Sequence, residues 1–104
     1  MSKFDNVSIT REANIYFDGK VTSRTVYFAD GTTKTLGIMM PGDYEFNTDA
    51  KELMEISAGE LEIQLVGESW RSISGGESFY VPANSSFKLK VAKVTDYCCS
   101  YLAE

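Results

Sequence analysis

The chain has 104 residues, a net charge of -5, 43% apolar residues and no histidine. A domain of this length buries roughly two-thirds of its unfolded surface, and no stretch approaches the roughly 20 apolar residues of a membrane span. Lys and Arg are scattered singly, so the basic face that a nucleic acid polymer or a membrane surface needs is lacking, and residues 1–12 lack the apolar region of a signal peptide. We therefore expect one cytoplasmic domain.

The first forty residues contain short apolar segments separated by tight turns. Residues 1–13 are polar and predict a loose N-terminal arm or an edge strand, which leaves residues 14–104 as the domain. Segments 23–29 and 33–40 are predicted strands joined by an Asp-Gly turn. Frequent turns of this kind favour strands over helices.

The middle of the chain carries the clearest period-two pattern. Residues 44–48 alternate aromatic and polar side chains, and residues 49–52 are the only plausible helical turn. Segments 53–57 and 61–66 flank Gly59, the residue best able to adopt a positive φ. The simplest prediction is an antiparallel hairpin at the centre of a sheet.

Four further strands follow, at 70–73, 78–81, 87–91 and 96–102. In the last of them, Tyr97, Cys99 and Tyr101 alternate with Cys98, Ser100 and Leu102, so the two sets should lie on opposite faces. Eight to ten short strands without a convincing helix indicate a β-sandwich or a small barrel.

The adjacent cysteines Cys98 and Cys99 should also point to opposite faces, which prevents an easy bond between them. We expect two reduced thiols, as in a reducing compartment. The simpler interpretation is that both are small buried hydrophobes, and the alternative is a redox or nucleophilic role.

The absence of histidine excludes His-based triads and His general bases. It also removes the usual ligands of zinc, copper and non-haem iron. A carboxylate site for a hard cation stays open, but no ligand loop indicates one, and we expect no cofactor. A small anion such as phosphate stays possible, because it needs only one or two placed cations.

Two stretches resemble the cupin motifs. Gly76 to Phe87 follows the spacing of the second motif, with Pro82 after the glycine, and Pro41 to Gly59 follows the first. The resemblance implies an all-β fold: a single-domain cupin with a two-sheet jelly-roll β-barrel. The histidine positions of these motifs fall on Glu45, Asn47 and Phe87, so only Glu52 remains of the four usual metal ligands.

The whole string is similar to a narrower group. Segments 16–21, 42–48, 52–59, 79–82 and 97–102 resemble the pyrimidine/purine nucleoside phosphorylase family of small single-domain cupins. This resemblance implies that a nucleoside and orthophosphate react to give a free base and (deoxy)ribose 1-phosphate, with broad base specificity and no cofactor. The alternative is a non-catalytic, metal-free cupin that binds a small sugar or nucleotide-like ligand. A third hypothesis is a metal-dependent dioxygenase or isomerase that uses Glu45 and Glu52.

Phosphorolysis requires groups that hold phosphate and the ribose hydroxyls. We predict Lys20, next to Gly19, as the catalytic phosphate ligand, with Arg24 and Arg71 as rivals; each of these cations could instead be a solvated surface residue. Glu52 is the predicted acceptor for the ribose hydroxyls, because the motif points it into the barrel. A lone buried carboxylate is costly, which favours a functional role.

Aromatic residues on the predicted strands could bind the base. Tyr44, Phe46 and Phe87 could stack on any base, since every base has a π-face, or could simply pack in the core. Tyr97 could serve the pocket, the core or an interface. Because exposed strand edges pair readily, we also expect a homodimer.

Overall fold

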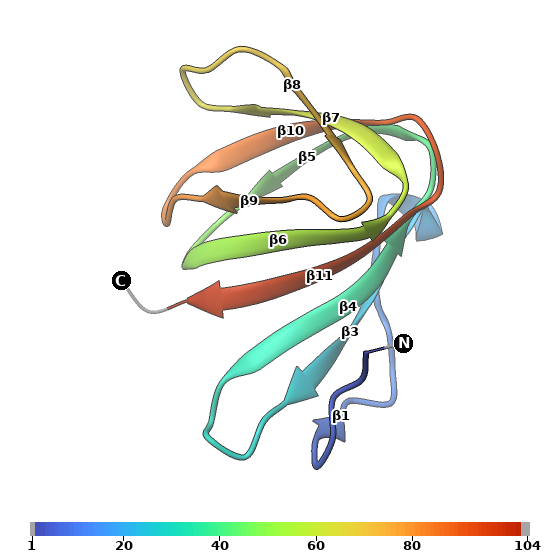
Figure 1. Ribbon diagram of the computed structural model, residues 1–104, viewed down its shortest axis with the longest axis vertical. Helices are drawn as coiled ribbons and strands as arrows, with labels where there is room; N and C mark the ends of the chain where they lie inside the picture. Colours follow the sequence, from blue (N-terminus) through green and yellow to red (C-terminus); the bar gives the residue numbers. More distant parts are fainter. Residues whose placement is uncertain (1, 103–104) are drawn as a thin grey trace.

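The computed structural model describes residues 2–102 as two antiparallel β-sheets (Figure 1). The larger sheet has the strand order β1-β3-β4-β11-β6-β9, with β2 paired to β3, and the smaller sheet has the order β5-β10-β7-β8. No helix among the described residues is long and apolar enough to cross a membrane. The elements are β1 (Ser8–Ile9), β2 (Asn14–Tyr16), the 3-10 turn η1 (Phe17–Gly19), β3 (Val21–Tyr27), β4 (Thr33–Met39), β5 (Gly42–Asn47), β6 (Lys51–Ala58), β7 (Glu60–Leu65), β8 (Arg71–Ser74), β9 (Ser78–Val81), β10 (Ser86–Val91) and β11 (Thr95–Leu102).

The predicted all-β, two-sheet jelly roll is confirmed. From β4 onward the chain repeatedly crosses between the sheets, at the connections before β5, β6, β7, β9, β10 and β11. The smaller sheet lies over β6, β9 and β11, while β3 and β4 extend away from it (Figure 1). The eleven strands of the described region exceed the predicted eight to ten, because β1 and β2 are very short.

The core lies between the sheets and follows the period-two pattern. On β10, Phe87, Leu89 and Val91 are buried, whereas Lys88 and Lys90 are exposed. Strand β10 thus contributes one apolar face to the core and one polar face to solvent, as expected for two packed sheets.

The hairpin predicted around Gly59 is wrong, because β6 and β7 belong to different sheets. Strand β6 pairs with β11 and β9, and β7 pairs with β10 and β8. Gly59 is the single residue between the two strands and has a φ of +116°. A side chain there would meet the Oγ1 of Thr95 and lie 2.7 Å from its Cα. One glycine therefore makes a sharp corner that carries the chain from one sheet to the other.

The helical turn predicted at residues 49–52 is also wrong. Asp49 and Ala50 form a bend, and β6 already begins at Lys51. Glu52 pairs with Tyr101 of β11 and with Val81 of β9, so sheet pairing overrides the local helix propensity.

The N-terminal segment lies along the edge of the larger sheet. Ser8 and Ile9 pair with Tyr27 and Val26 of β3. The ring of Phe4 packs edge-on against the ring of Phe28, with the two centroids 5.1 Å apart. Val26, which pairs with Ile9, is buried although it does not belong to the core between the sheets.

Candidate active site

A cavity of about 170 Å³ lies between the inner faces of the two sheets. Strands from both sheets contribute to its walls, so it is enclosed by the fold itself and not by surface loops. Its lining residues are Tyr16, Ser23, Thr35, Met39, Phe46, Asn47, Glu52, Met54, Phe87, Tyr97, Cys99 and Tyr101.

One wall of the cavity carries hydroxyl groups from the larger sheet. Ser23 of β3, Thr35 of β4, and Tyr97 and Tyr101 of β11 all face inward, and the hydroxyls of Thr35 and Tyr101 lie 3.5 Å apart. Burial raises the pKa of Tyr97 and raises the pKa of Tyr101 to about 12. Both phenols therefore keep their protons at neutral pH and can donate hydrogen bonds.

The position of the Tyr97 ring depends on a glycine in the middle of β4. Gly37 is paired directly with Tyr97, and a side chain at Gly37 would lie 2.7 Å from the Cζ and Oη atoms of that ring. It would also collide with the backbone carbonyl of Thr22. Glycine thus leaves the space through which the tyrosine reaches the cavity.

Glu52 supplies the cavity's carboxylate. The thiol of Cys99 donates to its Oε1 at 3.5 Å. Burial raises the pKa of Glu52 above its ordinary 4.5, and the nearby charge of Asp49 adds to this, while the bond from Cys99 opposes it. Burial also raises the pKa of the Cys99 thiol, which makes Cys99 a hydrogen-bond donor and not a thiolate nucleophile.

The cysteines behave as predicted. Both are free, Cys99 faces the cavity and Cys98 lies on the opposite face of β11, where it is also buried. The predicted alternation along residues 96–102 is therefore confirmed.

The opposite wall of the cavity is aromatic and belongs mainly to the smaller sheet. Phe46 of β5 and Phe87 of β10 stack with their centroids 5.8 Å apart and their planes inclined by 28°. Phe87 also meets Phe79 edge-on at 6.2 Å. The cavity thus has one hydroxyl-rich side and one flat apolar side.

The structure brings four of the predicted site residues together. Glu52, Phe46, Phe87 and Tyr97 all line the cavity. Tyr44 does not: it is buried in the core, and its hydroxyl donates to the carbonyl oxygen of Met40 at 2.6 Å.

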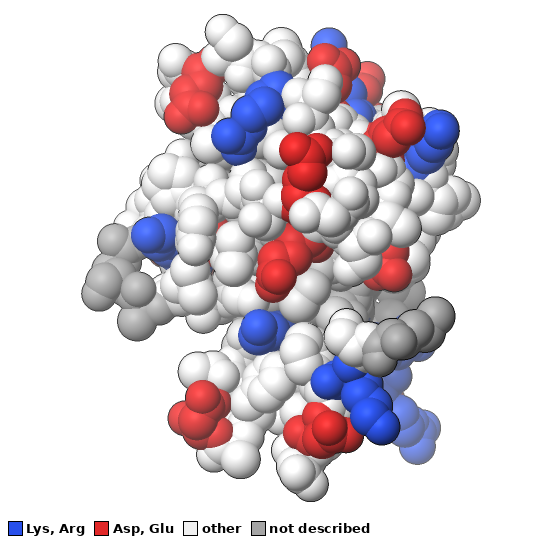
Figure 2. Space-filling view, in the orientation of Figure 1, with Lys and Arg blue, Asp and Glu red and all other residues white. Residues whose placement is uncertain are grey.

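The predicted cations lie elsewhere. Lys20 is exposed at the end of η1, Arg71 is exposed on β8, and the Nε of Arg24 donates to the carbonyl of Arg11. None of the ten Lys and Arg side chains, all within residues 2–102, lines the cavity. Acidic and basic side chains are interspersed on the face seen in Figure 2. An anion in the cavity would have to be held by neutral donors.

The residues at the cupin histidine positions are not grouped as metal ligands. Asn47 and Phe87 line the cavity, but Glu45 is exposed on the outer face of β5, beside a hollow shared with Trp70. No cluster of three or more His, Cys, Asp and Glu side chains suited to a metal ion occurs among residues 2–102. Glu45 and Glu52 therefore do not form the shared site that the metal-dependent hypothesis requires.

Sequence reasoning missed Tyr16, Ser23 and Thr35. Hydroxyl residues in an amphipathic strand are ordinarily assigned to the solvent face. Nothing in the sequences of β3 and β4 therefore indicated that Ser23 and Thr35 point inward. The alternation in β11 did provide a signal for Tyr101, because it put Tyr101 on the same face as Tyr97.

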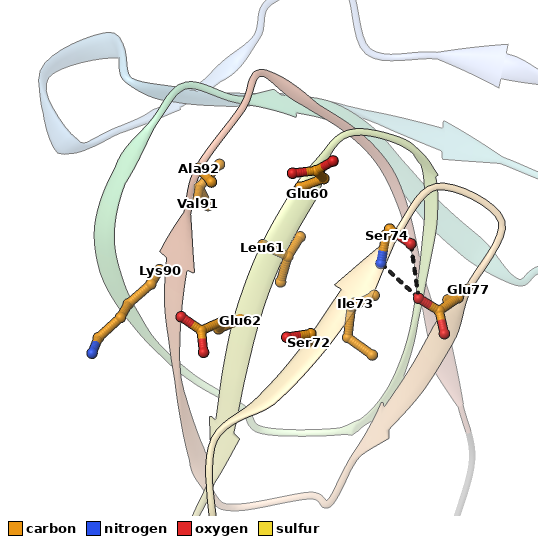
Figure 3. Close-up of a pocket in the computed structure, with 10 residues that line it drawn as sticks. All are labelled: Glu60, Leu61, Glu62, Ser72, Ile73, Ser74, Glu77, Lys90, Val91 and Ala92. Carbon is orange, nitrogen blue, oxygen red and sulfur yellow. Dashed lines mark hydrogen bonds between the residues drawn. The ribbon is translucent and has the colours of Figure 1, made fainter.

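A larger hollow of about 410 Å³ lies along β7, β8 and β10 (Figure 3). Glu60, Glu77 and Lys90, three of its charged side chains, have local partners. Glu77 accepts hydrogen bonds from the backbone N–H and the hydroxyl of Ser74, Glu60 pairs with Lys93 at 3.3 Å, and the Nζ of Lys90 lies over the Trp70 ring at 4.3 Å. The cavity between the sheets, with its buried hydroxyls and carboxylate, is the better candidate for chemistry.

Known proteins resemble the chain over nearly its full length. The family described as Pyrimidine/purine nucleoside phosphorylase matches residues 11–101. A pyrimidine/purine nucleoside phosphorylase from Chlorobium chlorochromatii is 79% identical over 98% of this chain and 99% of its own length. One from Geotalea daltonii is 64% identical over 99% of this chain and 100% of its own length.

Solved structures share the fold of the chain. A protein of unknown function from Acinetobacter sp. ADP1 superposes with a TM-score of 0.92 at 40% identity, over 96% of this chain and 98% of that chain. The EutQ protein of Clostridium difficile, at 18% identity, shares only the fold, with a TM-score of 0.67 over 81% of this chain and 69% of its own. The chain belongs to the pyrimidine/purine nucleoside phosphorylase family.

Proposed function

We propose that the protein catalyses phosphorolysis of purine and pyrimidine nucleosides, which gives the free base and (deoxy)ribose 1-phosphate. Family membership supports a nucleoside phosphorylase. The observation that carries the proposal is the two-sided cavity, because a nucleoside also has a hydroxyl-rich sugar and a flat base.

The aromatic wall suits a broad choice of base. Phe46 and Phe87 offer ring faces and no hydrogen-bonding groups, and base stacking tolerates every base. Neither ring selects a particular pattern of donors and acceptors, so purines and pyrimidines would bind by the same contact.

The hydroxyl wall and Glu52 suit the reacting sugar. Displacement at the anomeric carbon passes through an oxocarbenium-like centre, which a nearby carboxylate stabilises. In our proposal Glu52 accepts hydrogen bonds from the ribose hydroxyls and lies close to the developing positive charge.

Phosphate is itself a nucleophile, so no activated side chain is needed and positioning supplies much of the rate. We assign its binding to neutral donors of the cavity, Ser23, Thr35 and Asn47, in place of Lys20 or Arg71, because those cations lie outside the cavity. An anion held only by hydroxyl and amide groups should bind weakly.

The reaction itself is tested by incubating the purified protein with uridine or adenosine, with and without phosphate, and separating the products by chromatography. We expect free base to accumulate only when phosphate is present. If generous amounts of protein release no base, the proposal fails. A rise in melting temperature with nucleoside but without product would then support the non-catalytic binding alternative.

We also propose a homodimer formed through the outer face of the larger sheet. Leu36 and Ile38 of β4 and Tyr80 of β9 are exposed there, with Tyr80 56% accessible, and half-buried Leu53 and Leu102 lie on the strands between them. Apolar side chains exposed on neighbouring strands of one sheet face are typical of interaction sites.

Light scattering should therefore give twice the 11.6 kDa mass of the chain. Leu36→Glu places a charge in the proposed interface and should return the monomer mass. Val66→Glu, at a more exposed apolar residue in the turn before β8, should leave the dimer intact. A wild-type protein that already has the monomer mass would contradict the dimer.

A further inference from the structure

We infer that Tyr16 is a nucleobase-binding residue, which forms a corner with Phe46 at the mouth of the cavity and receives the flat base there. This inference rests on the proposed function and adds a base-binding residue to it. It follows from the ring geometry, from the backbone that holds Tyr16, and from its incomplete burial.

Tyr16 continues the aromatic wall on the opposite sheet. Its ring lines the cavity and meets Phe46 at 6.0 Å with an interplanar angle of 84°. Phe46 in turn stacks on Phe87. Two rings at right angles form a corner, in which a flat molecule can stack on one ring while its edge meets the face of the other.

The backbone after Tyr16 is held in an uncommon conformation. Phe17 and Asp18 have φ values of +51° and +56°, and Gly19 follows at +91°. Left-handed residues other than glycine are unfavourable, and they persist where the surrounding structure fixes them, frequently at ligand sites. Here the Phe17 ring packs against Tyr44 at 4.9 Å and Phe46 at 5.4 Å, which fixes the turn and so the direction of Tyr16.

Tyr16 is not needed to fill the core. Its side chain is 44% exposed, and no described residue forms a hydrogen bond with its hydroxyl. A large ring at a cavity mouth that is neither buried nor engaged has free surface for a ligand. Because this contact is made by stacking and shape, it serves purine and pyrimidine bases alike.

Steady-state kinetics with adenosine and uridine test the inference. Tyr16→Ala should raise the KM for both nucleosides by about tenfold, the effect of losing one base–aromatic contact, with the KM for phosphate unchanged. Tyr16→Phe keeps the ring and should stay within about twofold of the wild type. Tyr27→Ala is the matched control, because Tyr27 is 45% exposed, close to the value for Tyr16, but lies at the end of β3 outside the cavity, where its hydroxyl accepts a hydrogen bond from Thr10.

Wild-type nucleoside KM values in Tyr16→Ala would overturn the inference, as would a change shared equally by Tyr27→Ala. The proposed function is judged separately, by base release from the wild-type protein. If the wild type does not turn over, calorimetric titration with adenosine still decides the role of Tyr16. Binding at least tenfold weaker in Tyr16→Ala supports it, and equal binding refutes it.

Discussion

Replacing Glu52 with glutamine should lower kcat/KM for phosphorolysis by about two to three orders of magnitude, the usual effect of removing one group that stabilises transition-state charge. Glu52 is the carboxylate lining the cavity, and no cation among the described residues lines it. The amide keeps the shape and still accepts the bond from Cys99, so the loss reports the charge and not the packing. Base release at saturating phosphate measures it.

The same substitution should stabilise the protein at neutral pH. Burial raises the pKa of Glu52 above 4.5, so between 4.5 and the raised value the folded state binds more protons than the unfolded state. Stability is therefore lost as the pH rises through this window, and glutamine avoids the loss. Glu52→Gln should melt at a higher temperature than the wild type at pH 7, and the difference should shrink below pH 4.5.

Glu45→Gln provides the control, since Glu45 is exposed on the outer face of the smaller sheet, away from the cavity and from the proposed dimer face. It should change neither the rate nor the melting temperature appreciably. Full activity in Glu52→Gln would remove this residue from the site and leave the family assignment untouched. A melting temperature of Glu52→Gln below that of the wild type at pH 7 would contradict the destabilising effect of the buried Glu52 charge.

The alternation of side chains was enough to predict which residues share a face. It placed Tyr97 with Cys99 and Tyr101, and it gave the bounds of β9 as they are found. Alternation does not say which strands pair, because pairing depends on contacts distant in sequence. This is why the hairpin at Gly59 was predicted within one sheet, although β6 pairs with β9 and β11.

The motif positions predicted part of the site, although Glu45, which also lies at a motif position, is on the outer face of β5. Glu52 and Phe87 lie at motif positions on β6 and β10, and both reach the cavity. Tyr44 shares the inward face of β5 with Phe46, but the neighbouring rings and Met40 enclose it before the cavity begins. Lys20 follows a turn, and the direction of a long side chain after a turn is not fixed by any period.

The corner at Gly59 makes Gly59→Ala a strongly destabilising substitution. A φ of +116° strains any L-residue by about 1–2 kcal/mol, and crowding against a packed backbone adds about 1–3 kcal/mol. The added methyl group would lie 2.7 Å from the Cα of Thr95, a backbone atom that cannot rotate away. A loss of about 2–5 kcal/mol is a large part of the total free energy of unfolding of a small domain. Denaturant unfolding followed by circular dichroism measures it.

Gly67→Ala separates the two causes of this loss. Gly67 also has a positive φ, +77°, but a side chain there meets nothing within 4 Å. It should therefore cost only the backbone strain, about 1–2 kcal/mol. If both variants lose the same free energy of unfolding, the close approach of Thr95 to Gly59 is not what demands glycine. A clearly larger loss at Gly59 means that the crossing between the sheets depends on that contact, and so does the alignment of Glu52 on β6 with the aromatic wall opposite.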